Sequence, residues 1–356
     1  MIIDIVKIFV PAALAFFIGI GITPIVTHYL YKHKAWKKKA GKVGLGGGGT
    51  PIFNNLHKDR EVGIPRMGGI VIWASSFITI ILIWAISKIF PGEITQKLDF
   101  LSRNQTWIPL FTLMAGSLVG LVDDVYEISS TLRQGTGGLS LRARLLIVGA
   151  VALFVALWFF FKLDITTIGM PFIEDLAVGW FFIPFFILVT LALYASGVID
   201  GIDGLSGGVF AVIFAAYSGI AFYQQQIDLA AFSAMIAGGI LAFLWFNIPP
   251  ARFYMSETGT MGLTITLAVV AFMTDSLGGG YGVLVLPIVA FPLAITVLSD
   301  IIQVLSKKIR GKKVFLVAPI HHHFEALGWP GYKVTMRFWI ISVIFAIIGM
   351  ILALIG

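Results

Sequence analysis

Long apolar stretches alternate with short polar loops along the whole chain. Each stretch holds about 20 residues, enough for a helix to cross a hydrocarbon core of roughly 30 Å. Lipid offers the backbone no hydrogen-bond partners, so these stretches must be helices rather than open strands. The pattern therefore predicts an all-α integral membrane protein, a single domain over residues 1–356 with about ten transmembrane helices. The predicted spans are 8–30, 68–90, 106–122, 143–161, 182–198, 207–224, 229–247, 258–274, 281–305 and 336–355.

Composition supports a membrane protein and argues against several other classes. Hydrophobic residues make up 58% of the 356 positions and charged residues only 12%, whereas soluble domains carry about 25% charged residues. The short alternating segments of an outer-membrane barrel are absent from the sequence. Because there is no cysteine, disulfides and thiolate metal sites are excluded. The first apolar stretch is longer than a signal-peptide core, so we expect it to remain as the first helix.

Basic residues gather in the first, third and ninth of the loops that ten spans create. The positive-inside rule therefore predicts that the odd-numbered loops are cytoplasmic and that both termini are extracytoplasmic. These charges suit anionic membrane lipids, whereas no folded basic domain supports nucleic-acid binding. The stretch Gly41–Thr50 is expected to be mobile. The basic residues of these loops are Lys32, Lys34, Lys37, Lys38, Lys39, Lys42, Lys58, Arg60, Arg66, Arg133, Arg142, Lys307, Lys308, Arg310, Lys312, Lys313 and Lys333.

Scarce acidic residues and a run of histidines also fall in odd-numbered loops. The predicted topology therefore brings four clusters to the cytoplasmic face, where we expect an active site. The clusters are Asp123–Asp124 at the end of the third span, Asp200 and Asp203 in DGIDG, Glu257 in YMSETG, and His321, His322 and His323 in APIHHHFE.

The carboxylates indicate a divalent cation. Two adjacent ionised carboxylates near a membrane interface call for positive charge, and Mg²⁺ takes one or two carboxylates together with water and phosphate oxygens. Two plainer interpretations remain open: Asp123–Asp124 can simply solvate a helix end, and Asp-Gly is a common turn former.

The histidine run calls for a different interpretation. Three consecutive histidines on a regular helix cannot all face one metal, and zinc ligands are usually spaced several residues apart. We interpret them as donors for an anionic substrate, together with Lys333 and Arg337, although an incidental polar loop is the alternative. Asn247 is costly in lipid, so it is expected at the membrane edge or facing a polar cavity. This combination is typical of phosphoryl transfer, which depends on charge neutralisation and positioning, and the membrane setting favours a lipid substrate.

Several segments resemble the polyprenyl-phosphate N-acetylhexosamine-1-phosphate transferases of glycosyltransferase family 4. The resemblance runs from about Gly63 to Arg337. Its motifs are IPRMGGI (64–70), GLVDD (120–124), DGIDGL (200–205), FLWFN (243–247), YMSETG (254–259) and APIHHHFE (318–325). The histidine run followed by GWPGYKVTMRFW (328–339) is similar to the phospho-N-acetylmuramoyl-pentapeptide transferase branch, whereas GIPRMGG (63–69) is closer to the GlcNAc-1-phosphate branch.

The resemblance implies a bacterial cytoplasmic (inner) membrane enzyme of peptidoglycan synthesis. Such an enzyme moves phospho-MurNAc-pentapeptide from UDP-MurNAc-pentapeptide to undecaprenyl phosphate with Mg²⁺, giving lipid I and UMP. It also suggests a homodimer. The other branch leaves open transfer of GlcNAc-1-phosphate, or of another HexNAc-1-phosphate from a UDP-HexNAc. Carried over by motif, the resemblance implies three sets of site residues. The catalytic residues are Asp123, Asp124, Asp203 and Arg144, and the metal ligands are Asp200 and Glu257. The substrate-binding residues are Asn247, His321, His322, His323 and Arg337.

Departures from the family pattern keep other interpretations open. Two family asparagines read Tyr194 and Gly197, Ile199 replaces a common Thr, and Met-Gly-Asp reads Met-Ser-Glu at 255–257. Arg144 replaces a lysine and cannot act as a proton donor. A non-catalytic binder of lipid phosphate or nucleotide sugar is therefore an alternative. A transporter is a further one, although its carboxylates should lie near the bilayer midplane.

Overall fold

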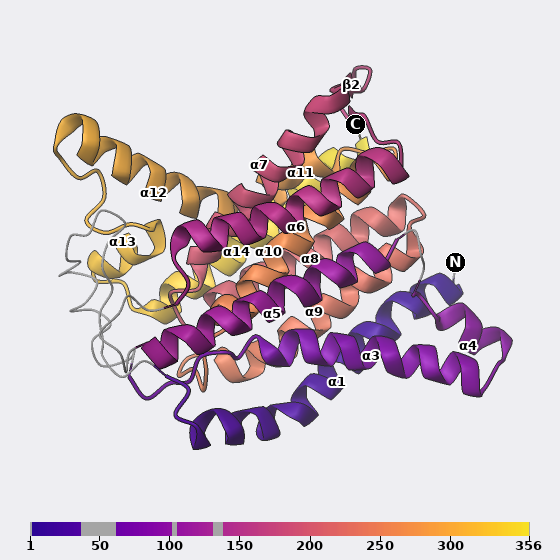
Figure 1. The fold of residues 1–356 in the computed structure, drawn as a ribbon, viewed down its shortest axis with the longest axis horizontal. Coiled ribbons are helices and arrows are strands. Elements are labelled where there is room, and N and C mark those ends of the chain that lie inside the picture. Colours follow the sequence, from indigo (N-terminus) through magenta and orange to yellow (C-terminus); the bar gives the residue numbers. More distant parts are fainter. Residues whose placement is uncertain (1, 37–61, 102–104, 131–137, 356) are drawn as a thin grey trace.

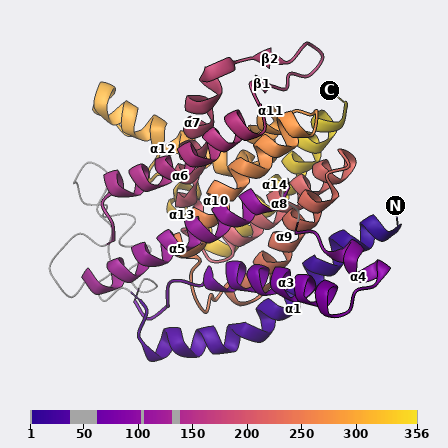
Figure 2. The ribbon, with the colours of Figure 1, turned by 45° about the vertical axis from the view of Figure 1, so that its right-hand side comes forward.

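The computed structural model describes residues 2–36, 62–101, 105–130 and 138–355 and consists of long helices that run side by side (Figures 1 and 2). Among these residues, nine helices are long and apolar enough to cross a membrane, or ten with one bent pair. The predicted multi-pass helical architecture is therefore confirmed. The long helices are α1 (Ile2–Lys32), α3 (Ile70–Ile89), α5 (Trp107–Ser130), α6 (Leu141–Lys162), α7 (Phe182–Ala195), α8 (Leu205–Tyr223), α9 (Ile227–Asn247), α10 (Ser256–Phe272) and α14 (Gly331–Ile355).

Shorter elements connect these helices. Two strands form an antiparallel hairpin in which Thr167 pairs with Ala177, and a π-helical turn extends the end of α10. The short elements are α4 (Glu93–Leu98), β1 (Thr167–Ile168), β2 (Leu176–Ala177), η1 (Gly179–Phe181), η2 (Ser196–Ile199), η3 (Met273–Leu277) and α13 (Ile320–Ala326). The glycine run Gly46–Gly49, predicted to be mobile, lies outside the described residues.

The predicted span at 281–305 is bent rather than continuous. The chain forms α11 (Gly282–Val289) and α12 (Phe291–Arg310), which meet at an angle of 74°. Ala290 leaves the helical conformation with φ −99° and ψ 30°, and Pro292 follows in the first turn of α12, where its missing N–H costs nothing. Helix α12 consequently points away from the bundle (Figure 1).

Glycines bring α5 and α10 into close contact. A Cβ at Gly116 would lie 2.8 Å from the Cα of Gly262, and a Cβ at Gly120 would overlap the backbone carbonyl of Glu257. Small residues at such contacts let membrane helices approach closely. Because α10 is almost completely buried, this contact fixes the height of Glu257 relative to the acidic pair of α5.

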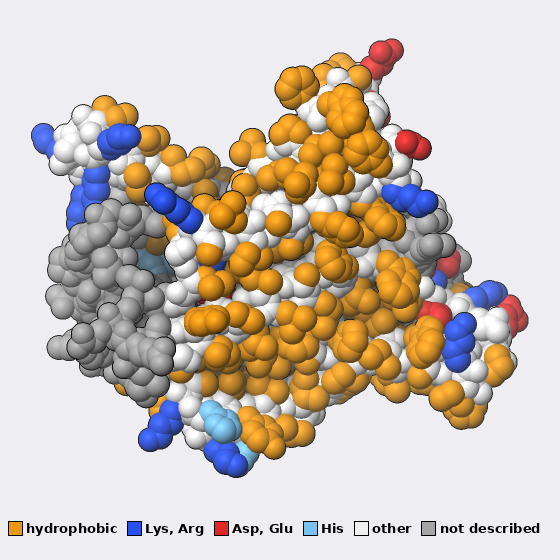
Figure 3. All heavy atoms as spheres, viewed as in Figure 1, with side chains coloured by type: hydrophobic (Ala, Val, Ile, Leu, Met, Phe, Trp, Pro, Cys, Tyr) orange, Lys and Arg blue, Asp and Glu red, His pale blue; other side chains and the backbone are white. Residues whose placement is uncertain are grey.

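The two ends of the bundle differ. The end of α5, the start of α6 and α13 lie at one end, whereas the start of α1 and the end of α14 lie at the other (Figure 1). Between them, Figure 3 shows a broad apolar flank. Helices α5 and α6 carry exposed apolar side chains, among them Leu118, Leu146 and Phe154. This apolar flank fits a protein surrounded by lipid.

Candidate active site

Helix α5 carries Asp123 and Asp124 inside its length. The prediction that this pair ends the helix is wrong, because α5 continues to Ser130. The extra turns are held in part by Arg66, whose Nη2 lies 3.0 Å from Oε2 of Glu127. Consecutive residues on a helix point about 100° apart, so the two carboxylates meet different partners.

Asp124 is fully buried against the start of α10. Its Oδ2 accepts hydrogen bonds from the backbone N–H of Thr258 at 2.9 Å and from the Thr258 hydroxyl at 2.6 Å. Its Oδ1 lies 3.4 Å from Nε of Arg66. A carboxylate at a helix N-terminus is stabilised by the free N–H groups and the helix dipole. Asp124 therefore fixes the first turn of α10.

Asp200 acts on the same helix turn from the loop after η2. Its Oδ2 accepts a hydrogen bond from the backbone N–H of Ser256 and its Oδ1 accepts one from the Ser206 hydroxyl, both at 2.7 Å. In the same loop Asp203 accepts from the N–H of Ala251 at 3.1 Å. Two acidic motifs that are distant in sequence thus hold the turn that carries Glu257.

Arg144 joins this turn to α5. Its Nη1 donates to Oε1 of Glu257 at 2.8 Å and lies 3.6 Å from Oδ2 of Asp123. The Tyr194 side chain also interacts with the Arg144 guanidinium. Asp123 accepts a further hydrogen bond from the N–H of Leu139 at 2.6 Å. Asp123 therefore ties the chain that leads into α6 to the acidic cluster.

Among the described residues, the charges of this cluster do not balance. Burial alone would lower the pKa of the Arg66 guanidinium, but nearby carboxylates, Glu127 first and then Asp124, Asp200 and Glu257, outweigh it and raise that pKa above its usual value. Five carboxylates (Asp123, Asp124, Glu127, Asp200 and Glu257) surround two arginines (Arg66 and Arg144). With all of them ionised, five negative and two positive charges leave a formal charge of −3, which favours binding of a cation.

The donor atoms also fit a hard cation. Oδ1 of Asp124 and Oγ of Ser256 are buried without a hydrogen-bond partner, and such atoms are usually satisfied in proteins. Among the described residues, no three His, Asp or Glu side chains form a ready-made metal group. Mg²⁺ needs only one or two carboxylates when water and substrate phosphates complete its shell. The residues present therefore suit Mg²⁺ bound together with a phosphorylated substrate.

The histidine run divides between two environments. His321 and His322 are buried, and a Cβ at Gly201 would lie 2.9 Å and 2.6 Å from their Nε2 atoms. His322 also bonds to Oε2 of Glu325 through Nδ1 at 2.7 Å. His323 instead accepts a hydrogen bond at Nδ1 from the N–H of Leu316 at 3.2 Å. The structure thus brings two of the three histidines to the aspartate loop.

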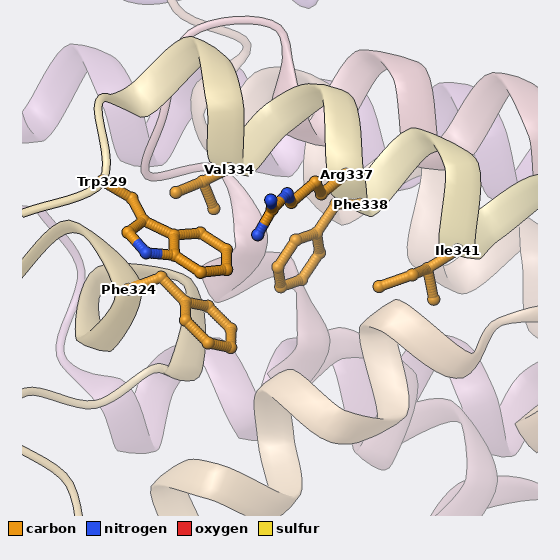
Figure 4. A pocket seen from close by; sticks show the side chains of 6 residues that line it. All are labelled: Phe324, Trp329, Val334, Arg337, Phe338 and Ile341. Carbon is orange, nitrogen blue, oxygen red and sulfur yellow. The ribbon is translucent and has the colours of Figure 1, made fainter. Parts of the chain in front are cut away.

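An apolar pocket lies beside the histidines, between α13 and α14. The Arg337 guanidinium stacks 4.1 Å above the Trp329 ring, which itself stacks on Phe324 (Figure 4). The cavity volume is about 210 Å³. A second pocket shares Phe324 and continues to Pro292 near the α11–α12 bend. The two pockets are neighbours that share Phe324, Phe338 and Ile341, and we refer to them together as the apolar groove; the Arg337 guanidinium lines the first of them.

Asn247 closes the last turn of α9 and is buried at the site end of the bundle. Its Oδ1 accepts from the N–H of Gly204 at 3.0 Å, and its Nδ2 donates to the carbonyl of Phe253 at 2.8 Å. The side chain therefore links the aspartate loop to the segment before α10. The predicted contact of Asn247 with substrate stays a prediction.

Sequence reasoning missed several contributors to the site. Arg66 was predicted as part of the basic first loop and of the IPRMGGI motif but not as a site residue, and Glu127, Ser206 and Thr258 were not identified as site residues. One signal was available for Glu127: it lies three residues after Asp124 on the same helix, where side chains share a face. The backbone pairing of the IPRMGG segment with YMSETG, through Gly68 N–H to Tyr254 carbonyl at 2.8 Å, carries no signal in a single sequence.

Comparison with known proteins gives consistent matches. The model of glycosyl transferase family 4 matches residues 106–275. The phospho-N-acetylmuramoyl-pentapeptide-transferase of Dichelobacter nodosus is 35% identical over 314 residues, covering 82% of this chain and 80% of that protein. The protein of the same name from Anoxybacillus flavithermus is 31% identical over 345 residues, 95% of each chain. That from Ruegeria sp. is 34% identical over 339 residues, covering 85% of this chain and 88% of that protein.

Proposed function

The chain belongs to the phospho-N-acetylmuramoyl-pentapeptide-transferase family, and we propose that it transfers phospho-MurNAc-pentapeptide from UDP-MurNAc-pentapeptide to undecaprenyl phosphate. An oxygen of the lipid phosphate forms a bond to the sugar-linked phosphorus of the UDP-sugar. The bond from that phosphorus to the bridging oxygen breaks and UMP leaves, so the other product is lipid I. The observation that carries this proposal is the anchoring of Asp124 and Asp200 on the helix turn that bears Glu257.

Mg²⁺ would be held by Asp200 and Glu257, and when bound it neutralises charge on the diphosphate. The protein itself supplies the positioning. Asp124 and Asp200 fix the first turn of α10, and Arg144 offers a guanidinium between Glu257 and Asp123. Fixed charges of this kind act without reorganisation during the reaction.

The apolar groove beside α13 and α14 suits the isoprenoid chain of the lipid substrate. The side chains that line it, among them Pro292 and Phe324, are apolar, and Arg337 is the one charged residue in the described lining. A guanidinium is a favourable partner for a phosphate. His321 and His322 lie between this groove and the aspartate loop, where they would donate to phosphate oxygens. The groove would open to the cytoplasmic leaflet of a bacterial inner membrane.

Transfer of GlcNAc-1-phosphate is the second candidate function. It is favoured by Arg66 of the GIPRMGG segment, which lies inside the acidic cluster at 3.4 Å from Asp124. The sugar accepted by the site distinguishes the two candidates.

The test is release of UMP by the purified protein with undecaprenyl phosphate, run in parallel with UDP-MurNAc-pentapeptide and UDP-GlcNAc. We expect turnover with the first donor, its loss on removal of divalent cations by EDTA and its recovery with Mg²⁺. Asp200→Asn should reduce turnover by about 100-fold or more. The matched control is Asp228→Asn, which removes a carboxylate paired with Lys7 near the start of α9. Turnover with UDP-GlcNAc alone would reverse the assignment, and release of UMP from neither donor would contradict it.

A further inference from the structure

Ser256 has an unusual backbone conformation at the first position of α10. Its φ is +58°, in the left-handed region that favours glycine, because a Cβ there crowds the following carbonyl. Its N–H donates to Asp200 at 2.7 Å and its carbonyl accepts from the Thr260 hydroxyl at 3.1 Å. These bonds on both sides of the residue hold the conformation. Non-glycine residues retained in such conformations cluster at functional sites.

The Ser256 side chain is buried but its hydroxyl is not satisfied. The residue is 5% exposed, and its Oγ has no hydrogen-bond partner among the described residues. A serine hydroxyl has one donor and two acceptor positions, and buried hydroxyls are normally bonded to protein or water. A glycine at this position would relieve the backbone and leave no polar atom unsatisfied. The hydroxyl therefore indicates a partner that the described residues do not supply.

Ser256 contacts one of the two residues assigned to the cation and directly precedes the other in the chain. Its N–H is bonded to a carboxylate oxygen of Asp200, and Glu257 follows it directly in the chain. In the part of the chain that the structure describes, the surrounding cluster has more carboxylates than arginines. A neutral hydroxyl can join such a site as an oxygen ligand without adding charge, as Ser and Thr do for Mg²⁺ in phosphate-binding loops.

We propose that the Ser256 hydroxyl is a further oxygen ligand of the divalent cation, beside Asp200 and Glu257. This inference rests on the proposed function, because it assumes that those two carboxylates bind the cation. It assigns a role to a side chain at a position where glycine would be the conformationally favoured residue.

Two substitutions separate the hydroxyl from the backbone effect. Ser256→Ala removes the hydroxyl and keeps a Cβ in the left-handed conformation, whereas Ser256→Gly removes both. Binding of Mn²⁺ is measured for each in lipid nanodiscs by electron paramagnetic resonance and by the shift in melting temperature, without substrate. We expect both variants to bind Mn²⁺ about tenfold more weakly than the wild type. Ser256→Gly should melt at a higher temperature than Ser256→Ala in the absence of cation.

The matched control is Ser218→Ala, which removes a buried hydroxyl of α8 that donates to the carbonyl of Ala230. It should leave Mn²⁺ binding unchanged. Wild-type Mn²⁺ affinity in both Ser256 variants would overturn the proposal, even if their release of UMP changed. Failure of the wild type to release UMP from either donor, with Mn²⁺ binding weakened in both variants, would overturn the proposed function and leave Ser256 as a cation ligand. Failure of the wild type to bind Mn²⁺ would overturn the assignment of Ser256, whereas release of UMP decides the proposed function independently.

Discussion

Arg144 donates from Nη1 to Oε1 of Glu257 at 2.8 Å, which links the first turn of α6 to the first turn of α10. The same nitrogen lies 3.6 Å from Oδ2 of Asp123. One guanidinium therefore connects two carboxylates that come from different helices. Any cation that binds Glu257 has to share this carboxylate with Arg144 or displace it, so the two residues should act as a coupled pair.

A double-mutant cycle tests this coupling. We expect Glu257→Gln and Arg144→Ala each to lower kcat/KM for UMP release by about 100-fold. The double variant should lose far less than the product of the two effects, because each single change already breaks the ion pair. The coupling energy is expected to be about 1–3 kcal/mol. Strictly multiplicative losses, with each variant still folded in detergent, would show that the residues act independently.

A second prediction concerns the contact between the aspartate loop and the histidines. A Cβ at Gly201 would lie 2.6 Å from Nε2 of His322 and 2.9 Å from Nε2 of His321, closer than real Cβ contacts allow. Gly201→Ala should therefore displace the two imidazole rings from the aspartate loop and reduce UMP release by at least about tenfold. Gly149→Ala in α6 is the control, because a Cβ there meets nothing within 4 Å. It should retain activity and stabilise the helix by up to about 1 kcal/mol. Normal turnover of Gly201→Ala would show that the histidines need not approach this loop.

Much of the architecture could be predicted from the sequence because the physical signals are local. A stretch of about 20 apolar residues specifies a membrane helix wherever it occurs. Because Asp124, Asp200 and Glu257 all fall in odd-numbered loops, the sequence predicted that they lie at one end of the bundle. The structure places all three there.

Features that tertiary contacts decide could not be predicted from the sequence. Helix α5 continues past Asp124 partly because Arg66, more than 50 residues earlier, pairs with Glu127. The bend between α11 and α12 arises from the backbone conformation of Ala290, which a hydropathy pattern does not predict. The division of the histidine run depends on the packing of α13 against Gly201. None of these contacts is visible in residue periodicity.

A third prediction concerns the orientation of the protein in the membrane. Because the natural chain has no cysteine, single cysteines report accessibility without background. A cysteine at Gly92, which precedes α4, should react with an impermeant maleimide in intact cells. A cysteine at Lys312, beyond the end of α12, should react only after the cells are permeabilised. The basic residues near α12 favour the cytoplasmic side. The opposite labelling pattern would place the candidate site on the extracytoplasmic face.

The last prediction distinguishes two roles for Asp123. As a general base it would remove the last proton of the lipid phosphate, whereas as a positioning group it would hold charge and backbone in place. Phosphate monoesters have a second pKa near 6, so the lipid phosphate is already largely dianionic at neutral pH and needs little help from a base. The structure gives the Asp123 carboxylate two partners, the N–H of Leu139 at 2.6 Å and Arg144 at 3.6 Å. Both partners favour positioning.

The two roles predict different pH profiles for Asp123→Asn. If Asp123 positions the site, the loss of UMP release should be of similar size from about pH 6 to pH 9, because the missing contacts to Leu139 and Arg144 do not return when the lipid phosphate ionises. If Asp123 is a base, activity should recover at alkaline pH, where no proton remains to be removed. Asp200→Asn in the same preparation is the reference, since neither role predicts its recovery. We expect parallel profiles for the two variants, and an alkaline recovery confined to Asp123→Asn would identify Asp123 as the base.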